Sequence, residues 1–135
     1  MPALFTVVEG PFKGRKFQPG KDGEFKLGRV PANCFQIADS ADVSREHFQV
    51  IITEPRCRLR DLNSNGGTYV AHAGQGEWLY YGKHPLPNDA TPDPKHDTEC
   101  DLRDGDTIRA GRTHIAVHLD KPPRTVTEKI VLPKV

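Results

Sequence analysis

The sequence predicts an all-β protein, an antiparallel β-sandwich built from short strands. Its 135 residues include 12 Gly and 12 Pro, a content that favours many turns and little helix. Short apolar runs recur along the chain at spacings of roughly 8–12 residues, the spacing expected for strands of a sandwich. Apolar and polar residues alternate with a period of two over residues 48–52 and 115–119, as in strands that bury one face.

Each predicted strand is a run of apolar or β-branched residues that ends at a turn signal. The first run, LFTVVE, stops at Gly10-Pro11, and later runs are separated by Pro19-Gly20, Asp22-Gly23, Pro55, Asn65-Gly66-Gly67, Asp104-Gly105 and Gly111. Gly, Asn and Pro adopt the backbone angles that tight turns require. The predicted strands are residues 4–9, 14–18, 24–28, 35–37, 47–53, 56–62, 68–70, 106–111 and 114–119.

One long segment interrupts this rhythm. Residues 71–100 are polar and Pro-rich, and they are predicted to form a long loop insertion between strands, of the kind that is usually functional or mobile. We interpret the aromatic residues Trp78, Tyr80 and Tyr81 as pinning this loop to its own domain, with a partner-binding patch as the alternative.

The last residues of the chain are set apart by a pair of prolines. Residues 121–135 begin KPP, which a central strand would not contain. This tail is predicted to be a linker or a strand packed back on the domain. The chain is therefore expected to hold one domain, residues 1–120, and a C-terminal tail.

Charge and hydropathy argue against nucleic-acid and membrane partners. Lys and Arg number 19 against 18 Asp and Glu, for a net charge of +1, so the chain has no global attraction to nucleic acid or anionic lipid. No apolar run approaches the length of about 18 residues needed to span a membrane, and the N-terminal residues do not resemble a signal peptide. The sequence predicts a cytoplasmic protein.

The residues that would carry catalysis or bind metal lack the expected spacing. Cys34, Cys57 and Cys100 are odd in number and form no C-x-x-C pair, which disfavours a disulfide framework and a zinc site. Cys57 alternates with Leu59 and is expected in the core. No nucleophile elbow or nucleotide-binding loop matches. We expect a noncatalytic binding module without cofactor or metal.

Three polar loops carry the best candidate site. The segments LGR at 27–29, DVSREH at 42–47 and DLNSNGG at 61–67 each lie at a strand end, and connections in a sandwich cluster at its two ends. If they converge, their arginine forks, serine hydroxyl, asparagine amide and glycine N–H groups suit a phosphate. Three charge-assisted hydrogen bonds would contribute roughly 5–9 kcal/mol before ordering costs.

The same segments resemble the forkhead-associated (FHA) domain family. The resemblance covers about residues 4–119 outside the insertion. It is carried by Gly28-Arg29, Ser44-Arg45-Glu46-His47, the Asp61–Val70 segment DLNSNGGTYV, and Asp104-Gly105-Asp106-Thr107-Ile108 with Gly111. It implies an antiparallel sandwich of the FHA/SMAD type with about 11 strands. It also implies recognition of phosphothreonine in an extended peptide.

The resemblance also implies roles for individual residues. Arg29, Ser44 and Arg45 would contact the phosphate, and Asn65 would support it. The family usually has Asn at the position of Gly66, where that side chain holds the peptide backbone, so this departure bears directly on peptide affinity. The residues expected to hold the loops in shape are Gly28, His47, Asp61, Ser64 and Gly67.

Asp42 is a tentative specificity residue. It lies two residues before Ser44, where the family often reads the third residue after phosphothreonine. An acid there would disfavour acidic residues at that peptide position and favour a basic one.

Two functions remain open at this point. In the first, the domain is a signalling module that recruits a phosphothreonine-containing protein, a Ser/Thr kinase or its substrate. In the second, it is a phosphate-independent scaffold that uses a sandwich face or the 71–100 insertion. A minor third possibility is phosphorylation of Thr125 or Thr127 and capture of the tail by a neighbouring copy. The sequence does not determine the oligomeric state.

Overall fold

The computed structural model describes residues 3–19, 23–29, 35–37, 43–53, 55–82, 90–93 and 98–120. These residues contain strands and no helix, which confirms the predicted fold class. The 12 strands are close in number to the expected 11. They are β1 (Ala3–Glu9), β2 (Lys16–Phe17), β3 (Gly23–Gly28), β4 (Phe35–Gln36), β5 (Phe48–Thr53), β6 (Arg56–Asp61), β7 (Thr68–Ala71), β8 (Leu79–Tyr81), β9 (Thr91–Pro92), β10 (Glu99–Asp101), β11 (Thr107–Ala110) and β12 (Thr113–Leu119).

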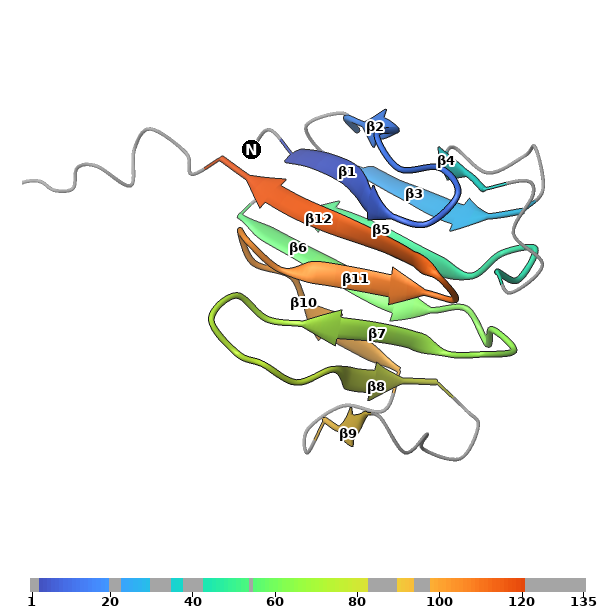
Figure 1. The fold of residues 1–135 in the computed structure, drawn as a ribbon. Coiled ribbons are helices and arrows are strands. Elements are labelled where there is room, and N and C mark those ends of the chain that lie inside the picture. Colours follow the sequence, from blue (N-terminus) through green and yellow to red (C-terminus); the bar gives the residue numbers. More distant parts are fainter. Residues whose placement is uncertain are drawn as a thin grey trace, which may run out of the picture.

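The strands form two stacked sheets (Figure 1). The seven-stranded sheet has the order β2-β1-β12-β11-β7-β8-β9, and the five-stranded sheet has the order β10-β6-β5-β3-β4. Neighbouring strands are antiparallel except in the β3–β4 and β8–β9 pairs, which are parallel. The parallel pairs put the short strands β4 and β9 at sheet edges.

The core lies between the sheets and follows the period-two pattern of the sequence. In β1, Phe5 and Val7 are buried while their neighbours are partly exposed. In β5, Phe48, Val50 and Ile52 face the same core from the other sheet. The rings of Phe5 and Phe25 meet edge to face with centroids 5.1 Å apart, a favoured geometry for aromatic pairs.

The prediction that residues 71–100 form a long loop was wrong in part. This segment contains three short strands, of which β8 and β9 extend the seven-stranded sheet and β10 forms an edge of the five-stranded sheet. Strands of two or three residues carry too few positions for a period-two pattern to show. They are stabilised by pairing with neighbouring strands, as Cys100 of β10 pairs with Leu59 of β6.

Aromatic side chains pin the described part of this segment to the domain, as expected. Tyr80 and Tyr81 are buried, and the Tyr81 hydroxyl donates a hydrogen bond of 2.7 Å to Asp93. The Trp78 ring packs edge to face on His114, with centroids 5.3 Å apart. The Trp78 contact fastens the end of the β7–β8 connection to β12.

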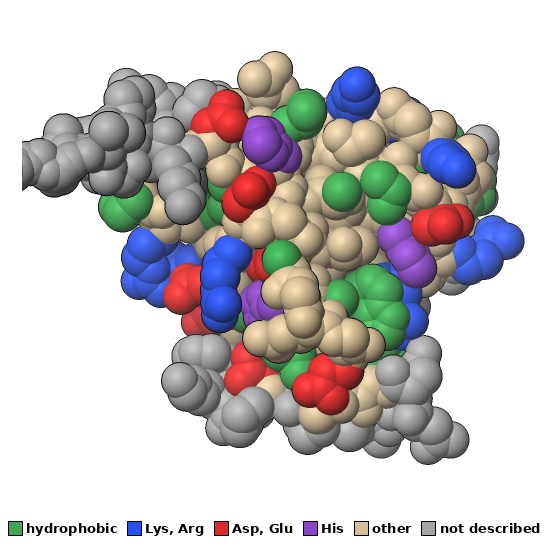
Figure 2. Space-filling view, turned by 60° about the vertical axis from the view of Figure 1, so that its left-hand side comes forward, with side chains coloured by type: hydrophobic (Ala, Val, Ile, Leu, Met, Phe, Trp, Pro, Cys, Tyr) green, Lys and Arg blue, Asp and Glu red, His purple; other side chains and the backbone are tan. Residues whose placement is uncertain are grey.

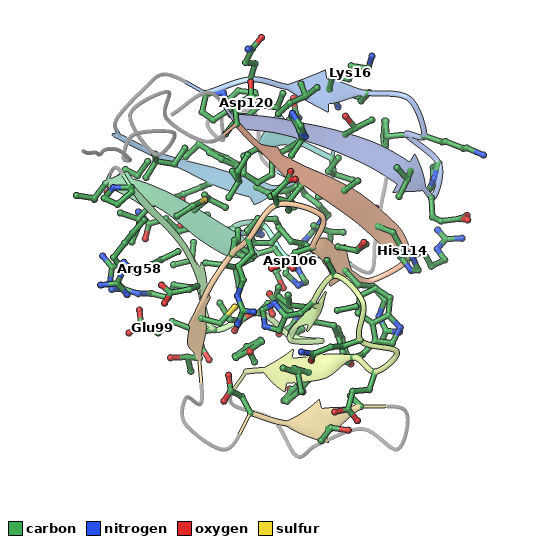
Figure 3. All side chains as sticks on the ribbon, turned by 90° about the vertical axis from the view of Figure 1, so that its left-hand side faces the viewer. Lys16, Arg58, Glu99, Asp106, His114 and Asp120 are labelled. Atoms are coloured by element: carbon green, nitrogen blue, oxygen red, sulfur yellow. The ribbon has the colours of Figure 1, made fainter. Side chains whose placement is uncertain are left out.

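Polar side chains also hold the β7–β8 and β10–β11 connections in place. Asp106 lies between the sheets in Figure 3 and is almost fully buried. Its carboxylate accepts hydrogen bonds from the backbone N–H groups of Ala73 and Arg103, and Nδ1 of His72 lies 2.8 Å away. The Asp-Gly-Asp segment singled out in the sequence therefore fixes two turns.

No helix of the described residues is long and apolar enough to cross a membrane.

Candidate functional site

Three loops meet at one end of the sandwich, at the right in Figure 1. They are the end of β3 with Arg29, the segment 43–47 before β5, and the β6–β7 connection 62–67. Backbone hydrogen bonds join them: Arg29 N–H donates to the Ser44 carbonyl at 3.1 Å, and Leu62 N–H donates to the His47 carbonyl at 2.9 Å. The structure brings the predicted loops together.

Arg29 is held by the loop that carries Ser44. Its Nε donates a hydrogen bond of 2.6 Å to the Val43 carbonyl, which fixes the plane of the half-buried guanidinium. The Gln36 side chain donates to the Arg29 carbonyl at 3.2 Å. A guanidinium has five N–H donors in one plane, so this anchor fixes the orientation of the four donors on the two Nη groups.

Ser44 links the second loop to the third. Its Oγ accepts a hydrogen bond of 2.9 Å from the backbone N–H of Asn65. A hydroxyl carries one proton of its own, so Ser44 retains the ability to donate to an anion. This bond places the Ser44 hydroxyl beside the exposed Asn65 and Gly66.

His47 is fully buried and braces the loops. Its Nδ1 lies 3.0 Å from the Ser44 backbone nitrogen, which can only donate, so Nδ1 is the acceptor. The proton of the neutral ring therefore sits on Nε2, which donates to the Gly67 carbonyl at 2.7 Å. This tautomer ties Ser44 to the β6–β7 connection.

Asp61 shapes the β6–β7 connection from within. Its carboxylate accepts hydrogen bonds from the Ser64 backbone at 3.1 Å, the Ser64 hydroxyl at 2.5 Å and the Thr68 hydroxyl at 2.7 Å. These donors compensate the burial of a charged group. Asn63 lies between them with a φ of 62°, a left-handed conformation that Asn tolerates better than most residues.

The two glycines of this connection differ in their surroundings. Gly67 has a φ of 78°, and a Cβ at this position would lie 2.2 Å from Cε1 of Tyr80. Gly66 has nothing within 4 Å of a Cβ position, so its surface is open. Gly67 is thus required by the fold, whereas nothing in the surrounding structure excludes a side chain at position 66.

Arg45 and Asp42 complete the predicted set. Arg45 is exposed on the segment between Ser44 and His47. Asp42 lies outside the described residues, so its predicted specificity role stays a prediction. Gly28 is buried at the end of β3, where its carbonyl accepts a hydrogen bond of 2.8 Å from Ile37 N–H.

A pocket that no sequence motif predicts adjoins this site. The pocket has a volume of about 580 Å³ and is lined by Glu9, Gly66, Tyr69, Arg109, Gly111, Arg112 and His114. Its residues come from β1, β7, β11, β12 and two turns, so no local motif marks it. The pairing of distant strands creates it.

The described residues contain no group of three or more His, Cys, Asp or Glu side chains that could hold a metal ion. Both described cysteines are buried free thiols. Burial raises the pKa of Cys57 and of Cys100 to about 12. Such thiols behave as core residues, as predicted for Cys57.

The family models and the solved structures indicate the same family. The FHA domain family model matches residues 25–111. An FHA domain solved in a structural and functional analysis of phosphothreonine-dependent FHA domain interactions is 27% identical, with 90% of this chain and all of that chain covered and a TM-score of 0.65. The comparison with curated proteins yields no match.

Two further solved structures are similar. The FhaA FHA domain, solved in complex with the intracellular domain of Rv3910, is 28% identical, with coverages of 86% of this chain and 99% of that chain and a TM-score of 0.61. The FHA domain of an Arabidopsis thaliana hypothetical protein is 24% identical, with coverages of 90% and 88% and a TM-score of 0.66. The latter likeness concerns the fold alone.

Proposed function

Because the chain belongs to the FHA domain family, we propose that it is a phosphothreonine-peptide-binding module that recruits a phosphorylated partner through loops at one end of the sandwich. The observation that carries the proposal is the hydrogen-bonded chain from Arg29 through Ser44 to Asn65. It sets a guanidinium, a hydroxyl and a turn of backbone N–H groups at one place. These groups together suit a phosphate dianion.

In this role the residues divide into those that contact ligand and those that hold them. Arg29 binds the phosphate through its Nη donors, because Nε is used by Val43. Ser44 donates its hydroxyl proton, and Arg45 supplies a second positive charge. Asn65 supports the phosphate from the β6–β7 connection. His47 and Asp61 are buried and act only by fixing the loops.

The partner in this proposal is a protein that carries phosphothreonine, either a Ser/Thr kinase or its substrate. In this role the module is not catalytic, and it acts by recruiting the phosphorylated partner. It is proposed to work in the cytoplasm, as expected from the sequence. Basic and acidic side chains are interspersed on the face in Figure 2, which does not favour nucleic acid as ligand.

The test is peptide binding measured by fluorescence anisotropy. A library of phosphothreonine peptides is compared with its threonine and phosphoserine counterparts, and the best sequence is titrated against Arg29→Ala. Loss of one charge-assisted contact of about 1.5–3 kcal/mol weakens binding by about 10- to 150-fold. Arg60→Ala is the matched control, because Arg60 is an exposed residue on β6 whose ion pair with Glu99 is long, at 3.8 Å.

A second function is supported by Gly66. The family's usual Asn is replaced by a glycine with open space above it, so one contact to the peptide backbone is absent. If folded wild-type protein binds no phosphothreonine peptide in the library, the phosphate-independent scaffold becomes the better proposal. Binding that depends on phosphate and on Arg29 rejects the scaffold as the primary role.

A further inference from the structure

The pocket beside Gly66 is built from a row of side chains that crosses the outer face of the seven-stranded sheet. Tyr69 of β7 pairs with Arg109 of β11, Arg109 pairs with His114 of β12, and His114 pairs with Glu9 of β1. Residues directly opposite each other on adjacent strands contact on one face. Figure 3 places His114 on this outer side, away from Arg58 and Glu99 on the other sheet.

Two backbone features complete the row. The β1–β12 register shifts between Val7 and Glu9, and such a bulge redirects the next side chain. Without the shift, alternation would point Glu9 to the same face as the buried Val7. At the opposite wall, Gly111 and Arg112 form a two-residue hairpin loop with a φ of 60° at Gly111, as expected for a type II′ turn.

Aromatic rings fix the position of Arg109. Its guanidinium carbon lies 3.8 Å from the Tyr69 ring centroid and 4.9 Å from that of Trp78. A guanidinium has its N–H donors in its own plane, so packing of rings against it favours hydrogen bonds at its edge. The position of this donor edge is therefore set by the fold before any ligand arrives.

The charge of the lining favours an anion. Arg109 and Arg112 contribute two positive charges, and Glu9 contributes one negative charge. Burial, and then the neighbouring Arg109, lower the pKa of His114 below its ordinary value, so this ring is neutral near pH 7. The pocket thus carries a net positive charge in a molecule whose total is only +1.

The pocket begins next to the proposed phosphate-binding loops, which are the segment 43–47 and the β6–β7 connection 62–67. Gly66 lines it, and the preceding residue, Asn65, donates to the Ser44 hydroxyl. Adjacent Cα atoms are about 3.8 Å apart, and an extended peptide advances about 3.3 Å per residue. A peptide held by its phosphothreonine therefore reaches the pocket within a few residues, and the volume of about 580 Å³ exceeds that of one side chain.

We infer that the pocket of Tyr69, Arg109, Arg112 and His114 is a specificity site that binds a carboxylate side chain of the phosphothreonine peptide. The inference rests on the proposed function and deepens it, since it states which peptides the module prefers. The residues that line the pocket include none of the described segment 43–47 that carries Ser44 and Arg45. An acidic residue at one peptide position strengthens binding through this pocket, independently of any repulsion that Asp42 exerts at another.

The test is a scan of phosphothreonine peptides in which Glu replaces Gln at each position flanking the phosphothreonine. Glu and Gln are nearly equal in shape, so the ratio of their Kd values reports charge alone. At one position the wild type binds the Glu peptide about 1.4- to 5-fold more tightly. In Arg109→Gln and in Arg112→Gln the ratio falls close to one.

Arg58→Gln is the matched control, because it removes the same charge from the outer face of the other sheet (Figure 3). It keeps the wild-type ratio. Arg112 is exposed in a turn, so its variant reports on the pocket even if Arg109→Gln does not fold. A wild-type ratio near one at every position, or a ratio that survives in the Arg112 variant, overturns the inference while phosphate-dependent binding stands. Failure of all phosphothreonine peptides to bind wild type rejects the proposed function itself.

Discussion

Replacing Gly67 with alanine should destabilise the domain, and the neighbouring glycine provides the control. A Cβ at position 67 would lie 2.2 Å from Cε1 and 2.7 Å from Cζ of Tyr80. The Tyr80 ring is buried and packs on Tyr69 at 5.3 Å between centroids. It is therefore not a flexible end that can move away at low cost.

Two effects set the magnitude for Gly67→Ala. The left-handed φ of 78° costs a non-glycine residue about 1–2 kcal/mol. Overpacking against a buried ring costs about 1–3 kcal/mol, and the lower entropy of the unfolded alanine chain offsets about 0.4–1 kcal/mol. The free energy of unfolding is expected to fall by about 1–4.5 kcal/mol. The Gly67 carbonyl accepts a hydrogen bond from His47, so the loops of the candidate site shift as well.

Urea unfolding followed by fluorescence measures this change, because Trp78 is the only tryptophan. With a slope near 2 kcal/mol/M, the midpoint of Gly67→Ala falls by about 0.5–2 M. Gly66→Ala should lie within about 0.5 kcal/mol of wild type, since nothing is within 4 Å of its Cβ. Equal midpoints for the two variants would refute the predicted contact with Tyr80.

Three other perturbations have expected outcomes. Gly66→Asn adds an amide in open space and should tighten phosphothreonine-peptide binding in anisotropy titrations by about 2- to 12-fold; unchanged affinity would show that this side chain does not reach the peptide. Burial raises the pKa of Cys57 and Cys100 to about 12, so iodoacetamide at pH 8 should label neither of these two thiols until the protein unfolds. Rapid labelling of Cys57 or Cys100 in the native protein, located by mass spectrometry, would contradict their burial. Because the pKa of His114 is lowered in the folded protein, the unfolded chain binds a proton at this histidine first as pH falls below about 6.5, and the free energy of unfolding decreases. His114→Gln should reduce this decrease between pH 7.5 and 5.5, measured by urea unfolding. An unaltered pH profile would argue against the lowered pKa.

The sequence alone determined the fold class and most of the strands. Long strands such as β1, β5 and β12 alternate apolar and polar residues because one face is buried, and that period is a local property of the chain. The turn residues between them are equally local. The strands that escaped prediction, β8, β9 and β10, have two or three residues each, and their conformation is set by the longer strand beside them.

The motifs also identified the loops of the candidate site before their positions were known. Arginine, serine and asparagine beside glycine predicted an anion site, and the convergence of the three loops is confirmed by the bonds between Arg29, Ser44 and Asn65. The sequence does not predict which ring nitrogen of His47 carries the proton. That follows from the donor at Ser44 and the acceptor at Gly67, which meet only in the folded protein.

The pocket beside Gly66 was decided by tertiary structure alone. Glu9, Tyr69, Arg109 and His114 are brought together by the pairing of β1, β12, β11 and β7, and a shift of register in β1 decides which face Glu9 occupies. Register depends on contacts between segments separated by as many as 116 residues, from Ala3 to Leu119, and a change of one residue moves a side chain to the opposite face. Local sequence therefore predicts the phosphate loops, whereas the neighbouring pocket exists only once the sheet has formed.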